Sequence, residues 1–250
     1  MKNHIVTFAA LLALAVAACG GPEQLQPTET LAQASTAGGI STLRLSSTTA
    51  AAGTAITATV ALSGSASSSS GGVIVYLAFQ NAILAGPKFI RIPNGLSSGT
   101  ATFYANPFLS APASASITAN TSSPQPSSFV IQTLSLTPSL TPPTTPRPQV
   151  SSLTLNPATV VSGSPVIGSV TLTDPAPPEG AAVQLSSSND FFNLDAELPP
   201  VVIVPAGATS VEFTVRTHIA NSAVTSVQEI IVGNYFGGTF QGAYLTIDRP

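Results

Sequence analysis

The residues that could catalyse a reaction or bind a metal ion are unevenly distributed along this chain of 250 residues. Between Glu29 and Asp174 there is no Asp, Glu, His or Cys. This stretch therefore lacks the groups that acid–base catalysis, activation of a nucleophile and metal binding require. Seven further acidic residues and one histidine, His218, follow Asp174. A catalytic or metal site, if the chain has one, is expected in this last part.

His218 could act as a general base for a serine if a carboxylate oriented its ring, as in a Ser–His–Asp triad. No Gly-x-Ser-x-Gly motif marks a nucleophile, so we interpret His218 as a solvent-exposed residue at the end of a strand. The alternative is an enzyme, or an accessory protein of an enzyme, that acts on envelope carbohydrate. Its site would lie around Asp190, Asp195, Glu197 or His218.

The segment 186–200 is the part of the chain richest in oxygen ligands for a metal ion. Calcium takes about six to eight oxygens, often from such loops, but the spacing here does not match an EF-hand. We favour a solvated loop between strands and expect no metal or other cofactor. Calcium held by Asp190, Asp195 and Glu197 is the alternative. The candidate ligands of this segment are Asn189, Asp190, Asn193, Asp195 and Glu197.

The overall composition excludes several classes of protein. Only 7% of the residues are charged and Lys plus Arg number 7, so the chain lacks the basic footprint of a nucleic-acid binder. The hydrophobic content of 44% is too high for a fully disordered chain. A single cysteine rules out a disulfide within the chain. We therefore predict a folded protein that is not an enzyme and does not bind nucleic acid.

Residues 1–18 have the pattern of a signal peptide. Lys2 supplies a positive charge, and an apolar stretch runs from Ile5 to Ala18. A membrane-spanning helix needs about 20 apolar residues, so this stretch is too short to be one. The small residues at its end suit cleavage by a signal peptidase. The sequence therefore predicts an exported protein.

The end of this segment, Val16-Ala17-Ala18-Cys19, resembles the lipobox of bacterial lipoproteins. The resemblance implies cleavage before Cys19, a diacylglycerol on its sulfur and an N-acyl chain such as palmitate on its amino group. Several acyl chains on one residue give stable anchoring in a membrane. Because Gly20 stands where many inner-membrane lipoproteins have Asp, the resemblance favours the outer membrane if the source has two membranes. The alternative is an ordinary signal peptide with a chance cysteine.

Two segments have the composition of linkers. Residues 19–40 begin with the lipidated Cys19 and continue as a flexible tether rich in Gly, Pro, Gln and Thr. Residues 137–149 are rich in Pro and Thr. Because proline fixes φ and donates no backbone hydrogen bond, this second segment is expected to be an extended, semi-rigid spacer.

The segments on either side of the spacer, 41–136 and 150–250, repeat each other. With an offset of 110, Leu43 aligns with Leu153 and Phe103 with Phe213. In both segments apolar residues alternate with polar ones, the period of half-buried strands. Each repeat has about seven such short runs. Together they predict an all-β protein with two tandem immunoglobulin-like antiparallel β-sandwiches.

The second repeat resembles the bacterial immunoglobulin-like repeats of cell-surface proteins. The resemblance rests on its opening SLTLNPATVVSG, on AAVQLSSS and on VIVPAGATSVEF, with Gly180 in place and Glu179 departing from the pattern. The first repeat is a degenerate version, with Ser46-Ser47 in place of Asn156-Pro157. The resemblance implies a structural, spacing or adhesive module and carries no catalytic residue.

These observations predict a membrane-anchored module that faces the surface or the periplasm and binds an unidentified protein or polysaccharide, or acts as a spacer. We expect a monomer. A subunit that self-assembles through exposed strand edges is an alternative. Tyr76, Tyr104 and Tyr244 fall on the polar phase of their strands. Aromatic residues in such positions can bind sugars or protein partners, and they also occur on sheets with no binding role.

Overall fold

The computed structural model describes residues 39–68, 71–121, 129–139, 147–188, 195–219 and 223–250. In these residues the chain forms eighteen β-strands and no helix, as an all-β protein should. The described part accordingly holds no helix long and apolar enough to span a membrane. The predicted signal peptide, Cys19, residues 20–38 of the tether and Asp190 lie outside the described residues.

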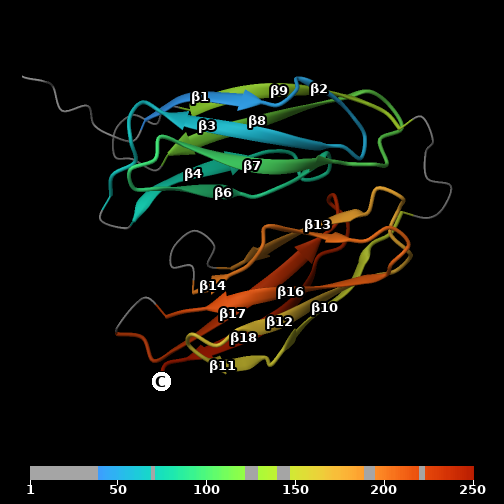
Figure 1. Cartoon of the computed structure of the whole chain (residues 1–250). Coiled ribbons are helices and arrows are strands. Elements are labelled where there is room, and N and C mark those ends of the chain that lie inside the picture. Colours follow the sequence, from blue (N-terminus) through green and yellow to red (C-terminus); the bar gives the residue numbers. More distant parts are fainter. Residues whose placement is uncertain (1–38, 69–70, 122–128, 140–146, 189–194, 220–222) are drawn as a thin grey trace, which may run out of the picture. The chain divides into compact units, whose positions relative to one another are not determined.

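The nine strands from Ile40 to Thr137 form two sheets that we call sandwich 1 (Figure 1). The four-stranded sheet has the order β1-β3-β7-β5 and contains β1 (Ile40–Leu45), β3 (Ala55–Leu62), β7 (Ser98–Ala105) and β5 (Leu84–Ala85). The five-stranded sheet has the order β2-β9-β8-β4-β6 and contains β2 (Thr49–Ala51), β9 (Phe129–Thr137), β8 (Ala113–Thr121), β4 (Gly72–Ala78) and β6 (Phe89–Pro93).

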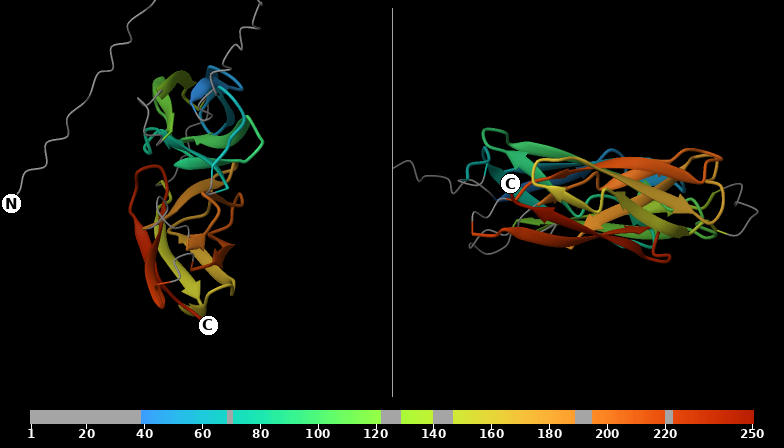
Figure 2. Two further views of the ribbon diagram at one scale, coloured as in Figure 1. Left: turned by 90° about the vertical axis from the view of Figure 1, so that its left-hand side faces the viewer. Right: turned by 90° about the horizontal axis from the view of Figure 1, so that it is seen from below.

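The nine strands from Val150 to Asp248 form sandwich 2, again with two sheets, whose layers can be followed in Figure 2. Its four-stranded sheet has the order β10-β12-β16-β14 and contains β10 (Val150–Asn156), β12 (Val166–Leu172), β16 (Ser210–Thr217) and β14 (Ala196–Glu197). Its five-stranded sheet has the order β11-β18-β17-β13-β15 and contains β11 (Thr159–Val161), β18 (Gln241–Asp248), β17 (Ser226–Asn234), β13 (Ala181–Ser187) and β15 (Val201–Val204).

The two sandwiches have the same topology, strand for strand. In each, one parallel pair joins the second strand to the last, β2 to β9 and β11 to β18. A register irregularity occurs at the same place in the first strand, between Ile40 and Thr42 and between Val150 and Ser152. Strand orders of this kind, with one sheet of the A-B-E-D type facing one that contains C, F and G, define the immunoglobulin fold. The predicted fold class is thus confirmed.

Each sandwich has nine strands where the sequence suggests about seven runs. The difference comes from strands such as β2 and β5, which have three and two residues. A run this short cannot display a period of two residues, so alternation does not reveal it.

The alternating apolar residues form the interior of each sandwich. In β3 the side chains of Ile56, Ala58, Val60 and Leu62 are all buried, and those between them are more exposed. In sandwich 1 the ring of Phe103 is fully buried and meets Phe79 edge to face, with centroids 5.1 Å apart. Burial of a side chain of this size contributes about 1.5–3 kcal/mol, so such layers supply most of the stabilisation.

Residues Pro205, Ala206 and Gly207 of the second repeat form a turn. The amide of Ala208 donates to the carbonyl of Pro205 at 2.9 Å, and Gly207 has a φ of +74°, which favours glycine. The strands on either side, β15 and β16, belong to opposite sheets. The turn therefore connects the two layers of sandwich 2 and does not close a hairpin.

Ordered structure extends into both ends of the segment with spacer composition. Thr137 is the last residue of β9. At the other end, the backbone of Gln149 is hydrogen-bonded to Thr173, and its side-chain oxygen accepts from the amide of Thr239 at 3.1 Å. Residues 140–146 lie outside the described residues.

Candidate functional site

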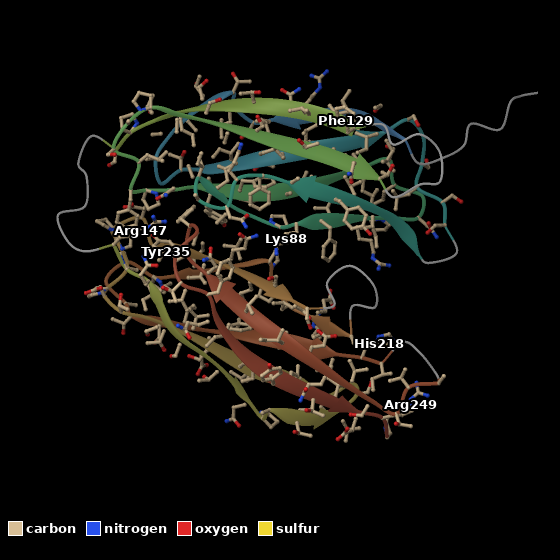
Figure 3. The ribbon with its side chains drawn as sticks, turned by 180° about the vertical axis from the view of Figure 1, so that it is seen from behind. Lys88, Phe129, Arg147, His218, Tyr235 and Arg249 are labelled. Carbon is tan, nitrogen blue, oxygen red and sulfur yellow. The ribbon has the colours of Figure 1, made fainter. Side chains whose placement is uncertain are left out.

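The structure brings His218 and Asp195 together through the backbone. The amide of His218 donates to the carbonyl of Asp195 at 2.8 Å, just beyond the short pairing of β14 with β16. His218 is exposed, whereas Asp195 is only 2% exposed (Figure 3 labels His218). Glu197 is exposed and lies opposite Arg216 in the same pairing. Opposite charges in such a pair stabilise a sheet by about 0.2–1 kcal/mol.

The hydroxyl groups around His218 have structural partners. The hydroxyl of Thr217 donates to the carbonyl of Ser164 at 2.7 Å, and Ser162 Oγ accepts from the amide of Ile219 at 2.9 Å. In the described part of the chain no three His, Cys, Asp or Glu side chains are grouped so that they could hold a metal ion. In the described residues, the groups around His218 form hydrogen bonds that hold the end of β16 to neighbouring segments.

Glu229 is a buried carboxylate that the sequence analysis did not single out. It lies on β17, is 1% exposed, and accepts a hydrogen bond from the hydroxyl of Ser187 on β13. The sequence pattern could have revealed its burial, because Val227, Glu229 and Ile231 alternate on the inward phase of their strand. A charged residue on an inward phase is unusual unless it is hydrogen-bonded.

The outer face of the five-stranded sheet of sandwich 1 carries a row of aromatic side chains. Strand pairing places Tyr76 of β4 opposite both Phe89 of β6 and Asn120 of β8. Asn120 in turn lies opposite Phe129 of β9. Adjacent strands are about 4.8 Å apart, so this row spans roughly 14 Å. Phe129 is 63% exposed, and Figure 3 labels it on β9.

A second row lies beside the first, two residues along each strand. Ala78 is opposite Thr118, and Thr118 is opposite Ile131, which is 50% exposed. We call the two rows together the aromatic face. It comprises Tyr76, Ala78, Phe89, Thr118, Asn120, Phe129 and Ile131.

A hollow of about 330 Å³ opens on the aromatic face. The small side chain of Ala78 lies between larger neighbours and leaves room there. The side chains that line the hollow carry one ammonium, two amides and two hydroxyls, which belong to Lys88, Asn81, Asn120, Thr118 and Tyr76. Lys88 lies just before β6, where its carbonyl accepts from the amide of Leu77 at 2.7 Å. Aromatic walls with a few polar groups are typical of small-molecule sites.

The three tyrosines on polar strand phases are not brought together. Tyr76 belongs to the aromatic face and is half-buried. Tyr104 is half-buried on β7, in the other sheet of sandwich 1. Tyr244 is 64% exposed on β18 of sandwich 2, opposite Ile230. Of the three, only Tyr76 lines the hollow on the aromatic face.

Tyr235 and Arg147 form a cluster that the sequence analysis missed. Tyr235 follows β17 and is fully buried, and the Arg147 guanidinium lies 5.9 Å from its ring centroid (Figure 3). Arg147 donates to the carbonyl of Phe236 at 2.5 Å. Burial lowers the pKa of Arg147. These contacts hold Arg147, three residues before β10, against the loop between β17 and β18.

Substitution of Tyr235 by Phe is expected to leave the stability of sandwich 2 unchanged or slightly higher at neutral pH. Its buried hydroxyl has no hydrogen-bond partner among the described residues, so the substitution removes an uncompensated polar group. Thermal unfolding of the wild type and Tyr235→Phe checks this. A loss of more than about 1 kcal/mol would show that the hydroxyl is bonded.

The same pair of proteins gives a pH test. Burial raises the pKa of Tyr235, and the Glu179 carboxylate raises it further. The unfolded chain therefore loses this proton at about pH 10, while the folded chain keeps it. Wild-type stability should fall as the pH rises above about 10, and the fall should be smaller in Tyr235→Phe. Equal slopes in both proteins would contradict the shift.

Comparison with known proteins finds solved structures that this chain resembles only at low identity and low TM-score. No family and no curated protein matches the chain. Among solved structures, it is similar to the D00-D0 domain of intimin, with 10% identity, 83% of this chain and 97% of that chain covered, and a TM-score of 0.29. It is also similar to the periplasmic chaperone SfaE, with 10% identity, 83% of this chain and 98% of that chain covered, and a TM-score of 0.31. A third similar structure is a chaperone–tip adhesion subunit complex of Csu pili from Acinetobacter baumannii, with 10% identity, 84% of this chain and 99% of that chain covered, and a TM-score of 0.30. TM-scores this low support no inference about activity or partners.

Proposed function

We propose that the mature protein is a bacterial lipoprotein, anchored through acylated Cys19, that presents two immunoglobulin-like sandwiches as a non-catalytic interaction module. The outer membrane is its favoured location where the source has two membranes. The segment after Cys19 has the composition of a flexible tether, which would hold the sandwiches away from the lipid surface.

The aromatic face is the observation that carries the interaction role. It combines the exposed ring of Phe129, the half-buried rings of Tyr76 and Phe89, a hollow and polar side chains on one surface of sandwich 1. The same sandwich contains no Asp, Glu, His or Cys, the usual acid–base and nucleophilic groups. A surface with this set of groups is suited to binding a partner and poorly suited to transforming it.

The anchor is tested by comparing the wild type with Cys19→Ala in a bacterial host. Intact mass should show a wild-type chain that begins at Cys19 with added acyl mass, found in the membrane fraction. Cys19→Ala should lose the acyl mass and leave that fraction. Thr28→Ala, in the tether but outside the lipobox, should behave as the wild type. A soluble, unacylated wild-type chain would overturn the anchored function.

A further inference from the structure

We propose that the aromatic face of sandwich 1 binds an acidic polysaccharide, a glycan chain that carries carboxylate or sulfate groups. The inference deepens the proposed interaction function by naming the class of partner. It rests on that interaction role and does not depend on the lipid anchor.

The row of rings supplies the stacking surface. Sugar rings have an apolar face of C–H groups that packs on the face of an aromatic ring, while their hydroxyls point to the side. Phe129 and Tyr76 flank Asn120 in register, so an extended chain crossing the strands would meet a ring, an amide and a second ring in turn. An amide both donates and accepts hydrogen bonds, as a row of hydroxyls requires.

The hollow supplies a place for one sugar unit. Its volume of about 330 Å³ lies at the lower end of the range for ligand sites, roughly 300–1,000 Å³. The amides of Asn81 and Asn120 and the hydroxyl of Thr118 line it beside the ring of Tyr76. These uncharged groups can bind hydroxyls from several directions without a fixed charge pattern.

The distribution of charge indicates that the glycan is acidic. Sandwich 1 contains three basic residues, Arg44, Lys88 and Arg91, and no acidic one. Lys88 lines the hollow, and Arg91 faces outward on β6, opposite Ile74. Ammonium and guanidinium groups form strong charge-assisted hydrogen bonds with carboxylate and sulfate groups. No carboxylate in the sandwich opposes such a ligand.

Sandwich 2 offers the matched comparison. It has eight acidic residues against two arginines, so it repels an acidic chain. Phe240 is 63% exposed, as Phe129 is. The two residues occupy equivalent positions in the two repeats, because the offset that aligns Leu134 with Leu245 also aligns Phe129 with Phe240. Tyr244 is 64% exposed, more than the half-buried Tyr76, and is the tyrosine of the control pair. Substitutions there remove the same kind of ring from a surface to which we assign no glycan.

The test measures binding of the full mature chain, in detergent, to immobilised polygalacturonate, with its carboxyl-reduced, uncharged form as the control ligand. The wild type should prefer the acidic form. Phe129→Ser and Tyr76→Ser should each weaken binding about tenfold, the loss typical of a key aromatic contact. Phe240→Ser and Tyr244→Ser should leave the affinity unchanged. Equal losses at both sets of positions would overturn the assignment to sandwich 1.

The charge argument has its own variant, Lys88→Gln, which removes the ammonium and keeps an unbranched polar side chain at the hollow. Lys88→Gln should reduce the preference for the acidic form. In the wild type, affinity for that form should fall as salt rises from about 0.01 M to about 1 M, because the screening length shrinks from roughly 30 Å to roughly 3 Å. Equal affinity for the charged and uncharged forms would overturn the acidic assignment.

The outcomes for the inference and for the proposed function are separable. A chain that is acylated and membrane-bound but binds neither glycan form overturns the inference and leaves the anchored module standing. A chain that prefers polygalacturonate through Tyr76 and Phe129 but is soluble and unacylated supports the inference and overturns the anchor. Binding of a protein to the aromatic face with no glycan binding would also overturn the inference.

Discussion

Phe103→Ala is expected to destabilise sandwich 1 by about 3–5 kcal/mol, the range for removing a large aromatic ring from a core. The ring is fully buried and meets Phe79 edge to face with an interplanar angle of 81°. It lies on β7 opposite Ile56 of β3. A cavity there would lose contacts from both strands, and close packing of the surrounding layers limits how far they can collapse into it.

Hydrogen exchange read by mass spectrometry measures this effect in each sandwich of the intact chain separately. Amides of β3 and β7 should exchange faster by a factor of about 100 or more, because each 1.4 kcal/mol corresponds to a factor of ten. Amides of β12 and β16 should change much less. Phe129→Ala removes an equal ring from the surface of the same sandwich and should cost no more than about 0.5 kcal/mol. A similar loss in both variants would mean that burial of Phe103 does not stabilise sandwich 1.

Gly168→Val is expected to destabilise sandwich 2 by about 1–3 kcal/mol or more through overpacking. Gly168 faces the interior on β12, directly opposite Phe213 of β16. A Cβ atom added at this position would lie only 2.2 Å from Cζ of the Phe213 ring. Because the ring is only 6% exposed, it has little room to move aside. The aromatic ring thus fills the space that the glycine leaves.

The same hydrogen-exchange experiment checks the substitution, now with the larger effect in β12 and β16. Ser169→Val, one residue along and on the opposite phase of β12, adds similar bulk outside the core and should change stability by at most about 0.5 kcal/mol. Combining Gly168→Val with Phe213→Leu should recover part of the loss, since the smaller side chain frees space. Full wild-type protection in Gly168→Val would show that the ring moves aside at no cost.

The alternation of apolar residues was sufficient to predict the longer strands and their inward faces, but not short strands such as β2 and β5. The period of two residues in Ile56, Ala58, Val60 and Leu62 decides which side is buried, because successive side chains of a strand point to opposite faces. The alignment of Leu43 with Leu153 predicted the duplication. In the structure, the four-stranded sheets of the two sandwiches have equivalent strand orders, and so do the five-stranded sheets. These features depend on local geometry, which short stretches of sequence contain.

The candidate site was less accessible from the sequence. Tyr76 was singled out by its polar phase, but Phe129 and Asn120 were not, and neither was the hollow beside them. Alternation determines the face of a strand and says nothing about which strand lies next to it. Residues 76, 120 and 129 become neighbours only through the pairing of β4 with β8 and of β8 with β9.

The buried polar residues show the same limit. Tyr235 lies in a loop rich in glycine, where composition suggests exposure, yet it is fully buried beside Arg147. Burial of a loop residue depends on which distant segments pack over it. The local pattern of apolar and polar residues carries no information about those segments. The sequence alone therefore determined the longer strands, the repeat and the uneven distribution of charge, while lipid attachment at Cys19 stays a prediction. Tertiary structure decided which side chains meet, because contacts between distant strands are set by sheet order and register.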